Sequence, residues 1–407
     1  MKQLGIYVQA PFCQTKCTYC NFHTGVVAKE RFAPYVEAVC REIRRHQELL
    51  RGAGVMYESG EWPFGCAQGK RVGSGERSED RFAVDTAYFG GGTPSLLETG
   101  DLRKILDAIR GSFATEFAEV TLEADPETVE EEKAAAWVSA GINRVSFGVQ
   151  SFSDKELAAV GRMHRREDIY RAVPMLRAAG IRNISFDLIA GLPHQTKESW
   201  ERSLEELIAL GPEHVSVYLL EVDEGSRLGK ELLRGGGRYS AGAVPSEDEM
   251  AGFYEIAQGA LRAAGYRHYE ISNWAKPGFE SKHNLKYWRR EPYLGFGAGA
   301  HSFSGTQRWA NVHDAAEYVK SIENGRLPVE QLEEVTAERA LEEELFLGLR
   351  QLAGIDVGKI EREYGVALAR RFEPLASAGL VEREGNVVRL AEEKLSVSNE
   401  VFVELMR

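Results

Sequence analysis

The sequence predicts an α/β protein in which a partial (β/α)6 barrel precedes an α+β C-terminal region with a winged-helix-like unit. Six short β-rich runs alternate with amphipathic segments, a pattern typical of a parallel sheet covered by helices. Six units are fewer than the eight that close a full barrel, so we expect an open barrel with its site at the carboxyl ends of the strands. The β-rich runs cover residues 5–10, 86–91, 119–125, 144–150, 183–191 and 214–222.

Helices are predicted between these strands because apolar residues recur there at helical spacing. Residues 51–81 interrupt the first crossover and are rich in Gly, Ser and charge without any period. We therefore expect a flexible surface insertion in which Cys66 is an incidental thiol. The stretch 229–249 is typical of a linker that leads into a helix from about Glu247. The amphipathic segments are 30–50, 99–111, 127–140, 165–179 and 196–210.

Past residue 265 the sequence becomes aromatic and loop-rich, and helices are then predicted near 313–323, 336–351 and 356–364. Over 368–390 a helix, a glycine turn and a short hairpin follow one another, which predicts a winged-helix shape. Such a shape usually binds DNA, but the flanking segments are acidic and favour a packing or lid role. The predicted units are a barrel over 1–230, an accessory region over 231–325 and a C-terminal domain over 326–407.

The composition is that of an acidic globular protein. Of 407 residues 43% are hydrophobic and 28% charged, and 62 Asp and Glu against 50 Lys and Arg give a net charge of −12. Nucleic-acid binding depends on cations that neutralise phosphates, so we expect no nucleic-acid partner. No apolar run reaches the roughly 18 residues of a membrane span, and the N-terminal residues lack the pattern of a signal peptide. We therefore expect a cytoplasmic protein with reduced thiols.

Three of the five cysteines crowd into eight residues of the loop that follows the first predicted strand. Cys13, Cys17 and Cys20 have the spacing C-x3-C-x2-C, and thiolates are the usual ligands of iron–sulfur clusters. A 4Fe-4S cluster held by three cysteines leaves one iron open to a small chelating ligand. The alternative is a zinc site completed by His23, since zinc takes four nitrogen or sulfur ligands. A zinc knuckle gives no reason for a barrel around it, so the cluster is the favoured interpretation.

The stretch Tyr7–Phe22, YVQAPFCQTKCTYCNF, resembles the signature of radical S-adenosylmethionine enzymes. In detail it is similar to the oxygen-independent coproporphyrinogen III dehydrogenase branch, which includes the HemW-type heme chaperones. The resemblance extends over nearly the whole chain outside 51–81, and it implies that S-adenosylmethionine binds the open iron and is cleaved reductively. The chain departs from the usual Tyr-x-His-Ile-Pro-Phe-Cys at Gln9 and Ala10, which leaves the cluster ligands intact and puts any role of that histidine in doubt.

The same resemblance identifies residues near the strand ends as contacts of S-adenosylmethionine. The glycine-rich turn 90–94 follows the second strand, where glycine lets the backbone approach a ligand and helix-start amides suit a carboxylate. A carboxylate at a strand end is otherwise often a helix cap, and we expect Asp125 before Pro126 to be one. The implied contacts are Tyr7, Tyr19, Gly91, Gly92, Thr93, Glu123, Gln150, Arg162 and Asp187.

The branch contains two functions, an enzyme that oxidatively decarboxylates coproporphyrinogen propionates and a chaperone that hands heme to acceptor proteins. The dehydrogenases have a fourth cysteine two places after the triplet, where this chain has Phe22. They also have a long N-terminal extension, whereas only six residues precede Tyr7 here. The segment His283–Trp288, HNLKYW, matches the HNxxYW motif of the heme chaperones. The chaperone is therefore the favoured function and the dehydrogenase the alternative, and we assign no catalytic residue.

His283 is the predicted heme ligand, since histidine is a standard axial ligand of heme iron. The alternative for a lone histidine among aromatics is a hydrogen-bonded core residue. His301 is a second candidate, although we expect it rather to shape a turn. Arg289 and Arg290 form either a solvated basic pair or partners for heme propionates. The expected partners are heme, an electron donor for the cluster and a heme-acceptor protein, with a membrane-associated acceptor among the candidates.

Overall fold

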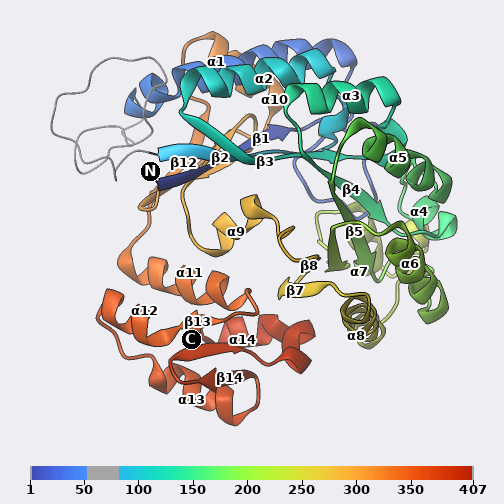
Figure 1. Cartoon of the computed structure of the whole chain (residues 1–407), viewed down its shortest axis with the longest axis vertical. Coiled ribbons are helices and arrows are strands. Elements are labelled where there is room, and N and C mark those ends of the chain that lie inside the picture. The colour runs from blue at the N-terminus through green and yellow to red at the C-terminus, as the bar shows by residue number, and fades with distance from the viewer. Residues whose placement is uncertain (1, 53–81, 406–407) are drawn as a thin grey trace.

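The computed structural model describes residues 2–52 and 82–405. The insertion predicted over 51–81, together with Cys66, lies outside the described residues from residue 53 onward. Within the described part the strands form one sheet of 12 strands and one of three strands near the C-terminus. Figure 1 shows helices along the outer side of the large sheet and the C-terminal elements below it.

Six parallel strands form the centre of the large sheet, and they lie side by side in the order of the sequence. This arrangement confirms the predicted partial (β/α)6 barrel. It also brings the carboxyl ends of all six strands to one edge, which is where parallel α/β sheets bind ligands. The strands are β1 (Lys2–Ala10), β2 (Phe82–Gly91), β3 (Thr115–Ala124), β4 (Arg144–Gln150), β5 (Asn183–Ala190) and β6 (His214–Leu219).

Helices cover the outer face. The short helix α4 (Asp154–Ala159) was not predicted, and all but one of the other five agree with the predicted segments within two residues. The exception is 127–140, where Pro126 opens a 3-10 turn and the extended backbone at Val129 delays the helix until Glu131. Proline suits the first position of such a turn because it has no amide to leave unpaired. The helices are α1 (Phe32–Gly52), α2 (Thr99–Ser112), α3 (Glu131–Ala140), α4 (Asp154–Ala159), α5 (Arg166–Ala179) and α6 (Lys197–Leu210).

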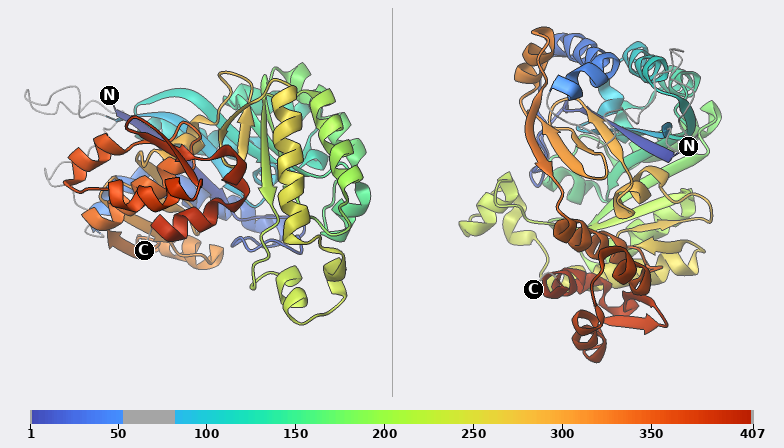
Figure 2. Two further views of the ribbon diagram at one scale, coloured as in Figure 1. Left: turned by 90° about the horizontal axis from the view of Figure 1, so that it is seen from below. Right: turned by 90° about the vertical axis from the view of Figure 1, so that its left-hand side faces the viewer.

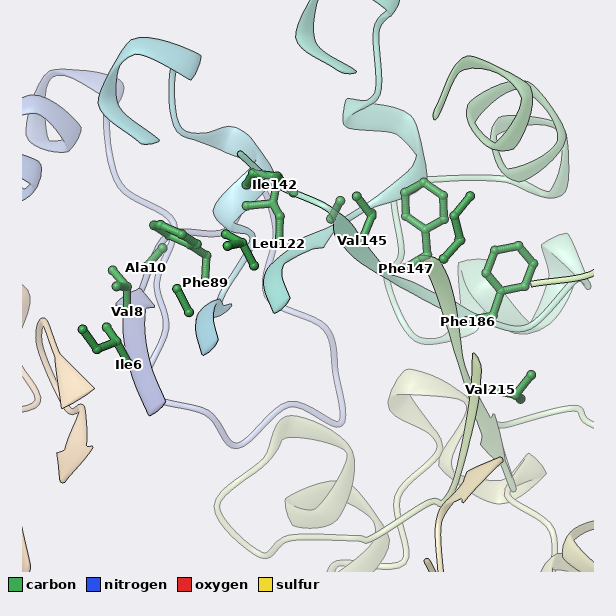
Figure 3. Close-up of a cluster of buried hydrophobic side chains, with 14 of the residues drawn as sticks. Ile6, Val8, Ala10, Phe89, Leu122, Ile142, Val145, Phe147, Phe186 and Val215 are labelled. Carbon is green, nitrogen blue, oxygen red and sulfur yellow. The ribbon is translucent and has the colours of Figure 1, made fainter. Parts of the chain in front are cut away.

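Each central strand presents apolar side chains to the helices and polar side chains to the inside of the barrel. Successive side chains of a strand point to opposite faces, so the register of each pair sets which residues share a face. On the outer face, buried residues such as Val8, Phe89, Leu122 and Phe147 belong to one continuous core (Figure 3). Fully burying each such side chain contributes roughly 1.5–3 kcal/mol. The opposite, inner face is polar and forms the candidate site.

Short flanking strands extend the sheet beyond both edges of the parallel core. β9 pairs parallel with β1 and leads to three antiparallel strands, while β8 pairs antiparallel with β6 and leads to β7. Most of them lie in the stretch predicted to be loop-rich. They were not predicted as strands because three to six residues are too few to show an alternating pattern. β12 lies after residue 325, so the large sheet takes in the first residues assigned to the C-terminal domain. The flanking strands are β7 (Arg267–Glu270), β8 (Asn273–Ala275), β9 (Tyr293–Phe296), β10 (His301–Phe303), β11 (Gln307–Asn311) and β12 (Val329–Glu334).

The stretch 229–249, predicted as a linker, contains the end of helix α7 and a 3-10 segment, whereas the helix predicted from Glu247 begins at that residue. Ser246 and Glu249 form a capping box in which each side chain bonds the backbone of the other. This arrangement satisfies two amides of the first turn and fixes where the helix starts. Figure 2 shows the segment before this helix projecting from the body of the molecule. The elements are α7 (Arg227–Leu233), the 3-10 segment Arg238–Ala243 and α8 (Glu247–Ala263).

The C-terminal elements form a three-stranded antiparallel sheet of order β13-β15-β14 with helices around it. The helix, glycine turn and hairpin predicted over 368–390 are present, and Gly379 follows the helix with φ +68°. Within the described residues no helix combines the length and the apolar character needed to cross a membrane. The elements are α10 (Ala315–Glu323), α11 (Ala337–Leu349), β13 (Ile355–Asp356), α12 (Val357–Tyr364), α13 (Ala369–Ser377), β14 (Val381–Glu384), β15 (Val387–Leu390) and α14 (Ser398–Leu405).

A buried carboxylate joins α1 to the flanking strands. Glu42 accepts hydrogen bonds from the amide of Gly297 at 2.9 Å and the side-chain amide of Asn311 at 2.7 Å. It also accepts one from the hydroxyl of Tyr318 on α10 at 2.5 Å. Burial raises the pKa of Glu42 to about 7, against the effect of these three donors. Since an unpaired buried charge is costly, the three donors are what hold this carboxyl group in the core.

We expect Glu42 to lower the stability of the fold as pH rises from about 4.5 to about 7. The pKa of Glu42 in the folded state lies above its unfolded value of 4.5. The stabilising effect of the bound proton is therefore complete below pH 4.5 and is lost as the pH rises through 7. The free energy of unfolding should fall by about 3 kcal/mol over this range. Urea midpoints between pH 5 and 8 should show a steeper decline for the wild type than for Glu42→Gln. Glu37→Gln, at an exposed position of the same helix, is the control and should follow the wild type. If the urea midpoints of wild type and Glu42→Gln fell equally steeply with pH, titration of Glu42 would not be the cause of the decline.

Candidate functional site

Polar side chains from successive strands meet on the inner face of the barrel. In the register of the sheet Tyr7 lies opposite Tyr88, and Glu123 lies opposite Ser146. The hydroxyl of Tyr88 donates to Glu123 at 2.9 Å, and that of Ser146 donates to Asp187 at 3.2 Å. Buried polar groups need such partners. The inner face is therefore a connected polar surface near the carboxyl ends of the strands, suited to a polar ligand.

The cysteine loop, residues 11–25, leaves β1 at this same edge. The amide of Cys13 donates to the carbonyl of Gly25 at 3.0 Å, so the end of the loop returns along its beginning. The carbonyl of Thr18 accepts from the amide of Leu228 on α7 at 2.8 Å. The projecting segment seen in Figure 2 is thus tied to the cysteine loop, and the loop is braced from two sides.

Cys13, Cys17 and Cys20 are half-buried and form no disulfide. Burial raises the pKa of Cys13 and of Cys17, so metal binding must displace their protons. Among the described residues, no three His, Cys, Asp or Glu side chains converge as the ligands of a single ion do. In a 4Fe-4S cluster each thiolate binds a different iron, so three thiols on one braced loop fit it without such convergence. The zinc alternative requires His23 beside the thiols, and its ring instead packs at a tilt against that of His313.

Arg162 connects the cysteine loop to the strand ends. Its guanidinium donates to the carbonyl of Gly148 at 2.7 Å and to the sulfur of Cys17 at 3.8 Å. It also pairs with the carboxylate of Asp125, whose other oxygen accepts from the hydroxyl of Thr93 at 3.1 Å. The prediction that Asp125 caps a helix was wrong, because its side chain makes no cap hydrogen bond. The charged guanidinium of Arg162 is a stronger hydrogen-bond partner for this carboxylate than a backbone amide at a helix start.

Sequence reasoning therefore missed Asp125 as a member of the site. A signal was present: Asp125 comes two residues after Glu123, and residues two apart on an extended chain share a face. The Asp–Pro pair, which is typical of a cap, concealed it. In the structure Asp125 is the group that joins Arg162 to the glycine-rich turn through Thr93.

The glycine-rich turn after β2 lies against β1 and the cysteine loop. A side chain at Gly91, where φ is +111°, would collide with that of Gln9, and one at Gly92 would collide with the backbone of the loop. The amide of Gly91 donates to Glu123 at 3.0 Å. Those of Gly92 and Thr93 donate to backbone carbonyls of β1 and the loop at 2.9 and 2.6 Å. The amides that were predicted to bind a ligand carboxylate are thus hydrogen-bonded within the protein. Glycine is needed here because it lets the turn pack closely against β1 and the cysteine loop.

Glu123 is the central acid of this edge of the sheet. Burial raises its pKa to about 7, although Tyr88 donates a hydrogen bond that favours the charged form. The hydroxyl of Tyr7 donates to the side-chain oxygen of Gln9 at 2.8 Å, and the rings of Tyr7 and Tyr88 lie 6.0 Å apart. Gln9, the departure from the usual histidine, therefore holds Tyr7 in place and fills the space over Gly91.

Three further predicted contacts approach the site from different sides. Gln150 ends β4 with φ +63°, a conformation that costs a residue other than glycine about 1–3 kcal/mol. Its amide lies over Gly148 beside the guanidinium of Arg162, so the surroundings hold it there. Asp187 lies on β5, and burial raises its pKa. Tyr19 belongs to the cysteine loop, packs against a small apolar cluster and interacts electrostatically with Arg162.

His283 lies in the layer of the barrel below these residues. Figure 1 shows α9 (Lys282–Trp288) inside the curve of the sheet. Nδ1 of His283 is 2.9 Å from the hydroxyl oxygen of Thr86, Nε2 is 2.9 Å from that of Tyr287, and the ring stacks on Tyr88. The residue is 1% exposed, and burial lowers its pKa to about 3, so the ring is neutral. Both ring nitrogens are hydrogen-bonded, and His283 does not join the cysteines.

The end of the same motif contacts the C-terminal helices. The guanidinium of Arg350 lies 4.5 Å from the ring of Trp288, and Arg290 pairs with Glu343 on α11 at 3.1 Å. Arg290 is therefore neither the solvated cation nor the propionate partner that the sequence suggested, because its side chain is 10% exposed and bound to Glu343. Arg289 is exposed. The motif thus runs from the interior of the barrel to the C-terminal unit.

Two family models match parts of the chain. The Radical SAM superfamily matches residues 75–207, and the HemN C-terminal domain matches residues 335–393. Among solved structures, coproporphyrinogen III oxidase (HemN) from Escherichia coli, a radical SAM enzyme, aligns with a TM-score of 0.79. The identity is 21%, and the alignment covers 99% of this chain and 90% of that one. At this identity the likeness shows the fold, an α/β radical SAM fold with a C-terminal domain.

Curated relatives align along most of the chain. Heme chaperone HemW of Bacillus subtilis is 34% identical over 402 residues, which is 97% of each chain. Heme chaperone HemW of Synechocystis is 36% identical over 383 residues, 92% of this chain and 84% of the relative. That of Escherichia coli is 35% identical over 301 residues, 73% of this chain and 69% of the relative. Because this level of identity extends over nearly full lengths, the chain belongs to the family of the HemW heme chaperones.

Proposed function

We propose that this protein is a heme chaperone, which binds heme and transfers it to an acceptor protein. The observation that carries the proposal is the alignment with a relative named heme chaperone along 97% of both chains. Two features of the sequence agree with it. Phe22 stands where the dehydrogenases of the branch have a fourth cysteine, and the motif from His283 to Trp288 is intact.

The proposal includes a 4Fe-4S cluster held by Cys13, Cys17 and Cys20, with S-adenosylmethionine on its open iron. Three half-buried free thiols on a loop that is braced from two sides support it. Arg162 donates to the sulfur of Cys17 and so supplies positive charge beside the thiolates. When bound, the cluster and S-adenosylmethionine supply one-electron chemistry, and the residues of the chain orient and shield them.

The inner face suits S-adenosylmethionine, which carries hydroxyl, amino and carboxylate groups. Glu123 and Asp187 offer carboxylates to hydroxyl or amino groups, and Arg162, which pairs with Asp125, adds positive charge beside the place of a ligand carboxylate. The amides of the glycine-rich turn are already bonded, so in the proposal this turn shapes the site. The proposed contacts are Tyr7, Tyr19, Gly91, Gly92, Thr93, Glu123, Gln150, Arg162 and Asp187.

The proposed heme ligand is His283, and its surroundings set a condition on that role. Both ring nitrogens are engaged, so ligation of iron requires the ring to leave Thr86 or Tyr287. Each of these hydrogen bonds contributes about 0.5–1.5 kcal/mol, which an iron–imidazole bond can exceed. Heme binding at His283 therefore entails a local opening around α9.

The second candidate function is the oxidative decarboxylation of coproporphyrinogen III. The likeness of fold to HemN over 99% of this chain favours it. Phe22, in the place of the fourth cysteine, argues against it. The two functions share the cluster and differ in whether a porphyrinogen is converted or heme is carried.

We expect anaerobic reconstitution to load about four irons per chain and to give the broad absorption of an iron–sulfur cluster. Cys17→Ala should lose most of the iron and the colour, because it removes a cluster ligand. Cys40→Ala, at a buried thiol of α1 away from the loop, is the matched control and should load normally. Iron content in Cys17→Ala equal to that of wild type would rule out this cluster site, and a colourless zinc-containing wild type would establish the zinc alternative.

We expect the reconstituted wild type to bind ferric heme with the Soret band of histidine-ligated iron. Ligation by His283 predicts that His283→Ala loses the part of this band that the His283 imidazole contributes at saturating heme. Thr86→Val, which frees Nδ1 and keeps the imidazole, should retain the whole band. Thermal unfolding of Thr86→Val measures the lost hydrogen bond at about 1 kcal/mol. Absence of stable heme binding by the wild type would contradict the chaperone proposal. Unaltered heme binding by His283→Ala would show that another residue ligates the iron.

We expect no protoporphyrinogen when the reconstituted protein is incubated anaerobically with coproporphyrinogen III, a reductant and S-adenosylmethionine. The reason is that Phe22 replaces the additional cysteine of the dehydrogenases. Chromatography of the oxidised porphyrins measures substrate and product. Turnover to protoporphyrinogen would establish the dehydrogenase in place of the chaperone.

A further inference from the structure

Three histidines gather at the outer rim of the barrel beside the cysteine loop. These rim histidines are His23, three residues after Cys20, His301 at the start of β10, and His313 just after β11. The rings of His23 and His313 lie 3.9 Å apart between centroids, with 32° between their planes. His301 interacts electrostatically with both of the others. Chain segments far apart in the sequence therefore bring three imidazoles to one place.

Two of the rim histidines, His23 and His301, are in the state that binds iron. Partial desolvation, followed by the effect of His313, lowers the pKa of His23 and of His301, so their rings are neutral at neutral pH. A neutral imidazole is the form that ligates metals. Nδ1 of His313 is buried and has no hydrogen-bond partner in the described part of the chain. His23 and His301 are exposed, whereas His283 is enclosed with both nitrogens bonded.

The stretch around His23 also exposes large apolar side chains. Phe22 is 64% and Val26 is 60% exposed, although side chains of this kind are usually covered. The ammonium of Lys16 donates to the carbonyls of Phe22 and Thr24 at 3.4 and 3.5 Å, so a cation sits on the same loop. These are the groups that heme requires: an axial ligand, cover for the porphyrin plane and a partner for a propionate.

A bare metal ion fits this surface less well than heme does. The described residues contain no three His, Cys, Asp or Glu side chains that converge on one point. Heme iron already has four porphyrin nitrogens and needs only one or two axial ligands from the protein. Adjacent imidazoles beside exposed apolar side chains therefore suit a porphyrin.

We propose that the rim histidines, with Phe22, Val26 and Lys16, form a surface site that captures heme, with His23 as axial ligand and His313 supporting its ring. This inference rests on the proposed function and adds the point of entry. Heme reaches His23 without any opening of the barrel, whereas His283 is reached only after its hydrogen bonds break. Since His23 and Cys20 share one loop, the captured heme lies beside the proposed cluster.

The test is a heme titration of the full-length reconstituted protein, followed by Soret absorbance. The double variant His23→Ala with His313→Ala should bind heme at least about tenfold more weakly, and added imidazole should restore the ligand spectrum by replacing the lost ring. Phe22→Ser should weaken binding several-fold with the spectrum unchanged. His194→Asn, on the loop after β5 at φ +69°, is the matched control and should bind like the wild type.

The outcomes separate this inference from the function on which it rests. Tight binding by the double variant, with heme bound by the wild type, overturns the rim site and leaves the chaperone function standing. A wild type that binds no heme defeats both. Loss of binding in His283→Ala, with the double variant unaffected, assigns capture to His283 and also overturns the rim site. Circular dichroism and iron content show that each variant is folded and loaded.

Discussion

The alternation of side chains along six parallel strands is the constraint on which the rest of the structure depends. Because β1 to β6 run parallel in sequence order, one face of each strand lies under helices and the other lines the interior. The outer face is apolar, whereas each polar group inside needs a partner. The hydrogen-bonded pairs form layers along the strands. The pair of Thr86 and His283 lies farther from the carboxyl ends of the strands than the pair of Tyr88 and Glu123. A slip of one residue in any strand would turn these polar side chains toward the helices.

The short helix α9 connects the interior of the barrel to the C-terminal unit. At its start the amides of Lys282 and His283 donate to Glu119 on β3, each at 3.1 Å. At its end Trp288 lies under the guanidinium of Arg350. A movement of His283 away from its partners would therefore also strain contacts with the C-terminal helices. The motif has a packing role that the structure accounts for, beside the heme ligation proposed for it.

The cysteine loop carries both chemistries proposed for the protein. Toward the barrel, Cys17 lies beside Arg162, which in turn reaches the strand ends. On its far side the loop exposes Phe22 and packs the ring of His23 against that of His313. Phe22, which stands where the dehydrogenases of the branch have a fourth cysteine, lies on this exposed side of the loop. In the proposed function this is how a radical SAM scaffold gains a heme surface and keeps its cluster ligands.

The sequence by itself determined the elements of this protein, and the tertiary structure decided their partners. The six central strands, most helices and the helix start at Glu247 follow from patterns that repeat within one element. The flanking strands are too short to carry such a pattern. Asp125 was taken for a cap, Arg290 for a solvated or propionate-binding cation, and the two hydroxyl partners of His283 were not foreseen. Their partners Arg162, Glu343 and Thr86 lie 37, 53 and 197 residues away. Such pairs depend on strand order, register and helix docking, which exist only once the sheet has assembled.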